Sequence, residues 1–284
     1  MLNVLYQFNE KYAPFAGTSI TSLFENHKSD ITVYILGEEL TERSREQFHE
    51  LQEKYGHRIE IMDTSDVIAK MKEWGLPPYR GSYSANLRLF IPSFLNNGQE
   101  RIIYLDSDTI VNADLTELYK TDLGENVIAM SLDSLGSHYK QTCLGFLAEE
   151  PYYNSGVILF DLNKWRAEDF SGKMIDHIRS REWNYSSPDQ DLLNIICRGR
   201  IKTIGAKYNF QPVHEVFSDR AYAKCYGMDG YYTANELATS GKDVHIYHSL
   251  RFVGDFPWDA NTLHPYTELF DRYLAKSPWT GYVT

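Results

Sequence analysis

The chain has 284 residues, a hydrophobic fraction of 43% and a formal net charge of −11 at pH 7. That length and apolar content suffice to bury the core of one large domain. The negative charge argues against nucleic-acid binding and against docking to an anionic membrane, because both require a basic surface.

The cysteines and the N-terminal residues indicate the cellular compartment of the protein. Cys143, Cys197 and Cys225 are odd in number and have no paired spacing, which argues against a cysteine zinc site and favours a reducing compartment. The first residues lack a basic lead and a signal-length apolar run, and no stretch approaches the ~20 apolar residues of a membrane span. We therefore expect a cytoplasmic protein without a transmembrane segment.

Short apolar runs alternate with helical patterns along the first half of the chain. The predicted strands cover residues 3–8, 31–36, 58–63, 101–106, 127–133 and 156–162. The predicted helices between them cover 15–27, 41–55 and 84–95, of which 41–55 is the clearest, with Thr41 as N-cap and Gly56 as stop. This alternation predicts an α/β fold with a mostly parallel sheet and helices on both faces.

The second half of the chain is less regular. Helical patterns follow from residue 163, a Tyr-rich segment covers 208–243, 243–250 is a further strand candidate, and 260–276 a closing helix. Without repeats, low-complexity tracts or linkers, the pattern favours one domain with a decorated C-terminal part.

Two carboxylates, Asp106 and Asp108, stand where the strand predicted at 101–106 ends. In open sheets of this kind, ligands bind beyond the carboxyl ends of the strands. Such a pair can bind a hard divalent cation and leave open positions for a diphosphate. An Asp-x-Asp pair alone is a weak signal, since aspartates are common after strands.

Haloacid-dehalogenase phosphatases offer one alternative, because "DSDTI" is one step from their D-x-D-x-[TV] motif. Those enzymes carry the motif on the first strand, whereas here it lies some 100 residues into the chain and ends in Ile110. This alternative therefore ranks a distant second.

Seven ordered motifs resemble the retaining glycosyltransferases of family 8, which include lipopolysaccharide galactosyltransferases and glycogenin. They are "YQFNEKY" (6–12), "ANLRLFIPSFL" (85–95), "YLDSDTIVNADLTELY" (104–119), "YYNSGVILFDLNKWR" (152–166), "PDQDLLN" (188–194), "KYNFQP" (207–212) and "HSL…PW" (248–258). The resemblance implies a GT-A type, Rossmann-like fold. It places a nucleotide-sugar-binding catalytic domain at 1–258 and a C-terminal helical extension at 259–284.

The resemblance further implies a metal-dependent hexosyltransferase. It would move galactose or glucose from UDP-galactose or UDP-glucose to a glycan, glycolipid or glycoprotein acceptor. Asp106, Asp108 and His248 would bind Mn²⁺, with Mg²⁺ as the alternative. His245 lies on the opposite strand face and is expected to be structural.

Four residues carry the catalytic roles that the resemblance implies. Arg88 would contact the donor, and Asp189 would bind the hydroxyls of the donor sugar. Gln190 would lie on the sugar face opposite the leaving group, where an amide is a poor nucleophile and a front-face mechanism is favoured. Asp191 is the nearest carboxylate for a double displacement, the route of retaining glycosidases.

The remaining substrate-binding residues follow from the same motifs, except Asp133, which is chosen because it ends the strand predicted at 127–133. They are Tyr6, Gln7, Asn9, Tyr12, Ser107, Asp133, Asn154 and Arg251. The chain departs from the family at Asn9, Lys11 and Phe256, where the family has Asp, Asn and a phosphate-binding lysine. Arg251 is the only cation between His248 and Trp258 and is a candidate to replace that lysine. A catalytically silent UDP-sugar-binding protein remains the alternative of a different class.

Overall fold

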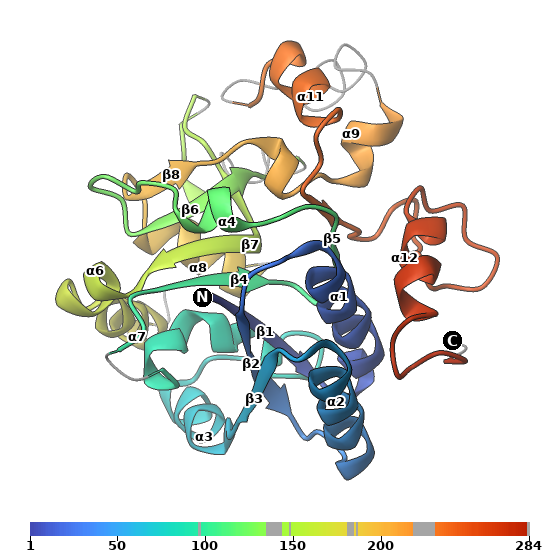
Figure 1. Cartoon of the computed structure of the whole chain (residues 1–284). Coiled ribbons are helices and arrows are strands. Elements are labelled where there is room, and N and C mark those ends of the chain that lie inside the picture. Colours follow the sequence, from blue (N-terminus) through green and yellow to red (C-terminus); the bar gives the residue numbers. More distant parts are fainter. Residues whose placement is uncertain are drawn as a thin grey trace.

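The computed structural model describes residues 1–95, 98–134, 144–147, 149–180, 185, 187–217 and 231–282. Its centre is a seven-stranded sheet with the strand order β3-β2-β1-β4-β7-β6-β8 (Figure 1). The strands are β1 (Leu2–Asn9), β2 (Ile31–Glu38), β3 (Arg58–Met62), β4 (Arg101–Leu105), β6 (Ile128–Leu132), β7 (Tyr153–Asp161) and β8 (Ile201–Thr203).

The sheet is mostly parallel, which confirms the predicted α/β class. β1 pairs in parallel with β2 and β4, β2 with β3, and β6 with β8. β7 runs antiparallel to β4 and β6, between which it lies. The carboxyl ends of β1, β2 and β4 therefore meet at one edge, where ligands bind in sheets of this kind.

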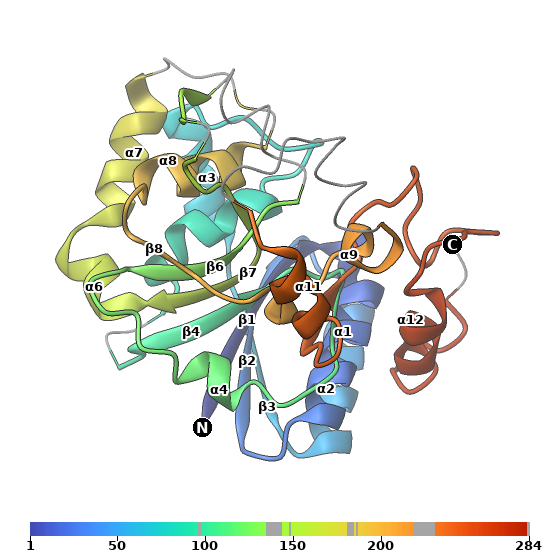
Figure 2. The same ribbon diagram turned by 90° about the horizontal axis from the view of Figure 1, so that it is seen from above.

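Helices cover both faces of the sheet (Figure 2). One core lies under α1 (Ala13–Asn26) and α2 (Glu42–Tyr55), while α12 (Thr267–Leu274) packs against α1 from outside. The other core lies under α3 (Ser65–Trp74), η2 (Ser84–Ser93), α6 (Leu162–Ala167), α7 (Phe170–Ser180) and α8 (Pro188–Ile196). Shorter elements complete the described chain: η1 (Glu10–Tyr12), α4 (Thr116–Tyr119), η3 (Ala206–Tyr208), α9 (Pro212–Val216) and α11 (Ala234–Ser240).

A second, two-stranded sheet pairs β5 (Thr109–Val111) with β9 (Ile246–His248). It joins segments more than a hundred residues apart in the sequence. It brings β9 beside β5, which follows directly after the exit of β4.

The predicted helix bounds agree with the structure in one case and differ in two others. Helix α2 begins after Thr41, whose hydroxyl accepts a hydrogen bond from Ser44 N (3.2 Å), and ends at left-handed Gly56, as predicted. The helix predicted at 84–95 is instead a 3₁₀ segment kinked at Phe90, because Pro92 cannot donate to the preceding turn. The closing helix begins only at Thr267 rather than at 260. Within the described residues, no helix is both long and apolar enough to cross a membrane.

The cysteines are only partly described. Cys197 is a buried free thiol at the end of α8, packed in the core, whereas Cys143 and Cys225 lie outside the described residues.

Candidate active site

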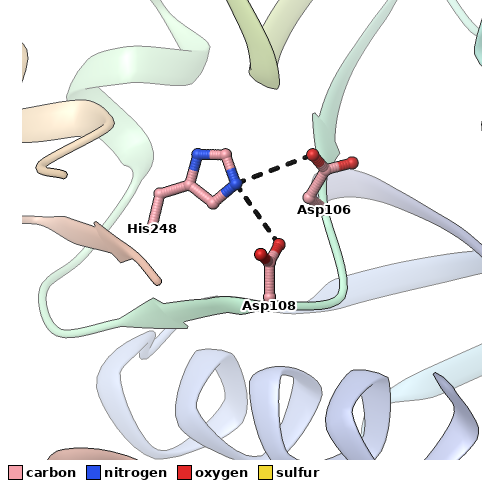
Figure 3. Close-up of side chains that lie close together, drawn as sticks. All are labelled: Asp106, Asp108 and His248. Atoms are coloured by element: carbon pink, nitrogen blue, oxygen red, sulfur yellow. Dashed lines mark ion pairs between the residues drawn. The ribbon is translucent and has the colours of Figure 1, made fainter. Parts of the chain in front are cut away.

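The two-stranded sheet brings a histidine to the paired aspartates. β4 ends at Leu105, and Asp106 donates its backbone N–H to the Gly156 carbonyl (2.8 Å). Thr109 pairs with His248 across β5 and β9, and the backbone N–H of the residue after His248 donates to the Asp108 carbonyl (2.9 Å). This register fixes the three side chains against one another (Figure 3).

The geometry of this trio suits a divalent cation. His248 Nε2 lies 3.3 Å from Asp108 Oδ1 and 3.7 Å from Asp106 Oδ2, and one ligand atom from each residue lies within 4.8 Å of the others. Nε2 is buried and makes no hydrogen bond of ordinary geometry with the described residues. Carboxylates and imidazole are both common ligands of divalent metal ions in proteins.

The other imidazole nitrogen fixes the tautomer. His248 Nδ1 lies 2.9 Å from Asn209 Oδ1. An amide oxygen can only accept, so Nδ1 carries a proton, and Nε2 is left free to bind a cation placed between it and the carboxylates. Asn209 in turn donates to Asn154 Oδ1 (2.8 Å). A polar chain behind the ligand therefore orients it, as is usual around metal sites.

The pKa values of His248 and Asp108 are each shifted by the other members of the trio. Burial lowers the pKa of His248, but the negative charges of Asp108 and Asp106 outweigh it and raise that pKa above its usual value. Burial also raises the pKa of Asp108, and the adjacent imidazole more than reverses this effect. Both shifts show that the two carboxylates favour a positive charge next to them.

Gly156 in β7 makes room for the imidazole. A Cβ at this position would lie 2.1 Å from His248 Cε1 and 2.6 Å from Nδ1. Any side chain here would push the ring out of place, because even the closest real Cβ contacts are longer. Glycine is therefore required next to the site.

Arg88 lies beneath the aspartates with its charge neutralised. It is 5% exposed and donates to Asp106 Oδ1 (2.8 Å) and the Ser155 carbonyl (2.7 Å), and its Nε forms an ion pair with Asp189 Oδ2 (3.2 Å). Its guanidinium also lies over the Tyr104 ring, 4.3 Å from the ring centre. Burial lowers the pKa of Arg88, but the charges of the two carboxylates raise it by more. The net pKa is above the usual value for arginine, so the side chain stays charged. Arg88 therefore forms ion pairs with Asp106 and Asp189 within the fold.

Gln190 joins the same network from the start of α8. Its Oε1 accepts from Ser155 N (3.0 Å), and its Nε2 donates to the Tyr152 hydroxyl (3.2 Å) and to Asp133 Oδ2 (3.3 Å). Asn154 Nδ2 also donates to Asp133 Oδ2 (3.0 Å). Four predicted site residues, Arg88, Asp133, Asn154 and Gln190, are thus connected through short polar contacts.

Asp191, one residue further along α8, has a different environment. Its side chain is fully buried, accepts from the Tyr152 hydroxyl and accepts from Ser187 N (3.1 Å). The helical turn separates it from the face that carries Gln190. Its bonds hold the first turn of α8 in place.

A cavity of about 510 Å³ opens above the trio. Nine of the predicted site residues line it: Gln7, Asn9, Tyr12, Arg88, Asp106, Ser107, Asp108, His248 and Arg251. The other predicted site residues do not line it: Tyr6, Asp133, Asn154, Asp189, Gln190 and Asp191. The position of Tyr6 is contrary to its predicted role at the donor. Its ring is fully buried under α1, and its hydroxyl lies 3.0 Å from Ser19 Oγ, because alternation along β1 turns Gln7 rather than Tyr6 to the cavity.

Other lining residues had no predicted role. The turn at Tyr79, Arg80 and Ser82 forms part of the wall, and Glu38 at the end of β2 holds this turn by accepting from Ser84 N (3.1 Å) and from the Ser82 hydroxyl. Arg80 has a φ of 50°, which is uncommon outside glycine. Sequence carried no signal for this contact, because a glutamate after a strand is usually solvated.

Comparisons with known proteins agree with this geometry. The family model described as glycosyl transferase family 8 matches residues 3–229. A putative glycosyltransferase of Haemophilus influenzae is 28% identical over 74% of this chain and 64% of its own length, so the chain spans less than two thirds of that relative. General stress protein A of Bacillus subtilis is 23% identical over 98% of this chain and 95% of its own.

Further matches are similar in extent. Lipopolysaccharide 1,2-glucosyltransferase of Escherichia coli K12 is 23% identical over 98% of this chain and 79% of its own. The crystal structure of galactosyltransferase LgtC with donor and acceptor sugar analogues superposes with a TM-score of 0.75 at 22% identity, covering 98% of this chain and 96% of that one. The match leaves the phosphatase alternative without support, and the chain belongs to glycosyl transferase family 8.

Proposed function

We propose that the protein transfers galactose or glucose from a UDP-sugar to a carbohydrate-containing acceptor, with retention at the anomeric carbon. The observation that carries this proposal is the trio of Asp106, Asp108 and His248 at the wall of a polar cavity of about 510 Å³. Such a cation site beside such a cavity suits a nucleoside diphosphate sugar, because the cation can neutralise the diphosphate. The names of the family relatives support a hexose as the transferred group.

Asp106, Asp108 and His248 would hold the cation, and Mn²⁺ is expected to serve better than Mg²⁺ because one ligand is an imidazole. When bound, the cation supplies neutralisation of the diphosphate leaving group. Arg88 contributes by fixing Asp106 Oδ1 at 2.8 Å, which leaves Oδ2 turned toward His248. Its charge also offsets the mutual repulsion of the carboxylates.

Gln190 favours a front-face reaction, in which the acceptor enters on the side the diphosphate leaves. Both of its amide ends are held, Oε1 by Ser155 N and Nε2 by Asp133 and Tyr152. An amide in this position can orient a sugar but is a poor nucleophile. Asp191 is buried beneath it and engaged in α8, so we assign Asp191 to positioning and Asp189 and Asn154 to sugar contacts.

Arg251 is the cation we propose for the diphosphate. It is exposed, lines the cavity and stands in the segment where the family lysine is replaced by Phe256. Arg251→Ala should weaken UDP binding by about 1–3 kcal/mol, as for a lost charge-assisted hydrogen bond. Exposed Lys242, six residues before His248, provides the control, and Lys242→Ala should leave binding unchanged. Equal UDP affinity in Arg251→Ala and the parent protein would show that Arg251 is a solvated surface residue without a role in diphosphate binding.

The organisation of the chain is consistent with catalysis by residues 1–258. Every proposed site residue lies in this range, while α12 packs against α1. We propose that residues 259–284 form a supporting extension. We further propose a cytoplasmic location, on the cysteine content alone.

A donor screen tests the proposed function. The parent is incubated with UDP-galactose, UDP-glucose and other UDP-sugars in Mn²⁺, and UDP release is measured. Asp108→Asn should abolish release, whereas Asp66→Asn, an exposed site on α3, should not. If the protein binds UDP in a metal-dependent way but releases UDP from no UDP-sugar, with or without an acceptor, it is a silent UDP-sugar-binding protein. A β-linked product by NMR coupling constant would refute retention.

A further inference from the structure

The segment between β9 and α12 contains a tight hairpin at residues 251–256. Phe252 and Asp255 exchange two backbone hydrogen bonds, Phe252 N to Asp255 O (2.9 Å) and Asp255 N to Phe252 O (3.2 Å). The two residues between them, Val253 and Gly254, have φ of 54° and 98°. Positive φ at both central positions characterises the type I′ hairpin turn.

Valine is a poor residue for this turn. A β-branched side chain at positive φ is a genuine outlier and costs on the order of 1–3 kcal/mol. Val253 gains nothing from burial, since it is 87% exposed. Leu250, just before the hairpin, also has a positive φ of 51°. The neighbouring contacts must therefore hold this backbone in shape.

The hairpin places Arg251 and Phe256 side by side. They flank the isolated antiparallel bridge between Phe252 and Asp255. The Arg251 guanidinium carbon lies 5.1 Å from the centre of the Phe256 ring. Both residues line the cavity that contains the metal trio.

Phe256 is itself fixed by a continuous aromatic stack. Its ring stacks on Trp258 with centres 4.6 Å apart and planes 10° apart, and Trp258 stacks on Phe15 of α1 at 3.8 Å and 12°. Trp258 also contacts Phe270 of α12 (5.3 Å). The Phe256 backbone N–H donates to Asp259 Oδ2 (2.7 Å). A guanidinium resting on this stack is thus connected to two helices.

Arg251 lines the same cavity as Asp106, Asp108 and His248. The pKa of Tyr12 is raised by burial and by the charge of Asp108, while the charges of Arg80 and Arg251 oppose that rise. Tyr12, Arg80, Arg251 and Asp108 also line the same cavity. Arg88, by contrast, directs its guanidinium to Asp106 and Asp189 and brings no uncompensated charge to the cavity.

We infer that Phe256 is a positioning residue, which holds the Arg251 guanidinium at the cavity for bidentate contact with the donor diphosphate. A planar cation stacked on an aromatic face keeps its N–H groups free at the edges and loses less conformational freedom on binding phosphate. Phe256 thus acts through Arg251 instead of contacting the phosphate. This inference rests on the proposed function, since it names a residue that serves the same diphosphate.

The test is a double-mutant cycle on UDP affinity, measured by calorimetry with Mn²⁺. Arg251→Ala should weaken binding about ten- to a hundredfold. Phe256→Leu should weaken it about two- to fivefold, and Phe256→Tyr, which restores the aromatic face, should match the parent. In the Arg251→Ala background, Phe256→Leu should cause no further loss. The Mn²⁺ affinity of each variant, which depends on the intact trio, should stay at the parent value and shows that the fold is kept.

The outcomes separate this inference from the proposed function. If the parent binds UDP only with Mn²⁺ but Phe256→Leu has the same loss in both backgrounds, or Phe256→Tyr fails to match the parent, the positioning role is overturned and the glycosyltransferase site stands. If the parent binds no UDP in Mn²⁺, the proposed function fails, and the role of Phe256 fails with it.

Discussion

Gly156→Ala tests whether the imidazole of His248 must lie where the structure has it. The new Cβ would be 2.1 Å from Cε1, whereas ordinary contact begins at 3.4 Å, so the ring must move by about 1.3 Å. That shift breaks the 2.9 Å hydrogen bond from Nδ1 to Asn209 Oδ1 and changes the angle at which Nε2 faces the carboxylates. The Gly156 backbone itself tolerates alanine, because its φ is not positive.

The magnitude follows from two costs. Overpacking of a rigid site destabilises the fold by about 1–3 kcal/mol. Disturbed orientation of a histidine ligand lowers metal affinity about 10- to 100-fold. Mn²⁺ affinity is measured by calorimetry, and the free energy of unfolding by urea titration in EDTA. Gly205→Ala is the control, since its Cβ would meet only Lys207 Cγ at 3.9 Å. Parent-like Mn²⁺ affinity in Gly156→Ala would refute the assignment of His248 as a ligand.

Three further predictions concern the neighbouring structure. Gln190→Ala should slow sugar transfer by a factor of ten or more, which corresponds to on the order of 1.4 kcal/mol of activation free energy, but leave UDP affinity unchanged. An equal loss of transfer rate and of UDP affinity would make Gln190 a donor-binding residue. Val253→Asn creates the Asn-Gly pair that type I′ turns prefer and should raise the free energy of unfolding by about 1 kcal/mol in urea titration; a lower value would contradict the turn assignment. Burial lowers the pKa of His214 to about 4, so the folded protein binds this proton less readily than the unfolded chain. Stability from neutral His214 is therefore present above pH 6.5 and is lost as pH falls toward 4, by about 2–3 kcal/mol. His214→Gln should flatten that part of the stability–pH curve, and an unchanged slope would refute the assignment.

Features set by local sequence were the predictable ones. Thr41 and Gly56 bound α2 because capping depends on residues within one turn. Asp106 and Asp108 end a buried strand, and the parallel sheet places such ends at a ligand-binding edge. His248 could be named only through the family resemblance, because its approach to the aspartates depends on β5–β9 pairing across more than a hundred residues.

Other site residues had no local signal. Asn209 and Gly156 act through tertiary contacts with His248 that no spacing encodes. Tyr6 was assigned to the donor through the family resemblance. Both faces of β1 are covered, so no polar–apolar alternation shows that Gln7 rather than Tyr6 faces the cavity. The 3₁₀ form of residues 84–93 reflects Pro92 within an otherwise helical pattern.

Calorimetric titration of UDP into the parent protein, in Mn²⁺ and again in excess EDTA, tests the metal-dependent donor site most directly. Asp106, Asp108 and His248 offer the cation three ligands, and the cation in turn neutralises a diphosphate that the carboxylates would otherwise repel. We expect UDP binding in Mn²⁺ and at least about a tenfold weaker affinity in EDTA. Equal UDP affinity in Mn²⁺ and in EDTA would contradict the account.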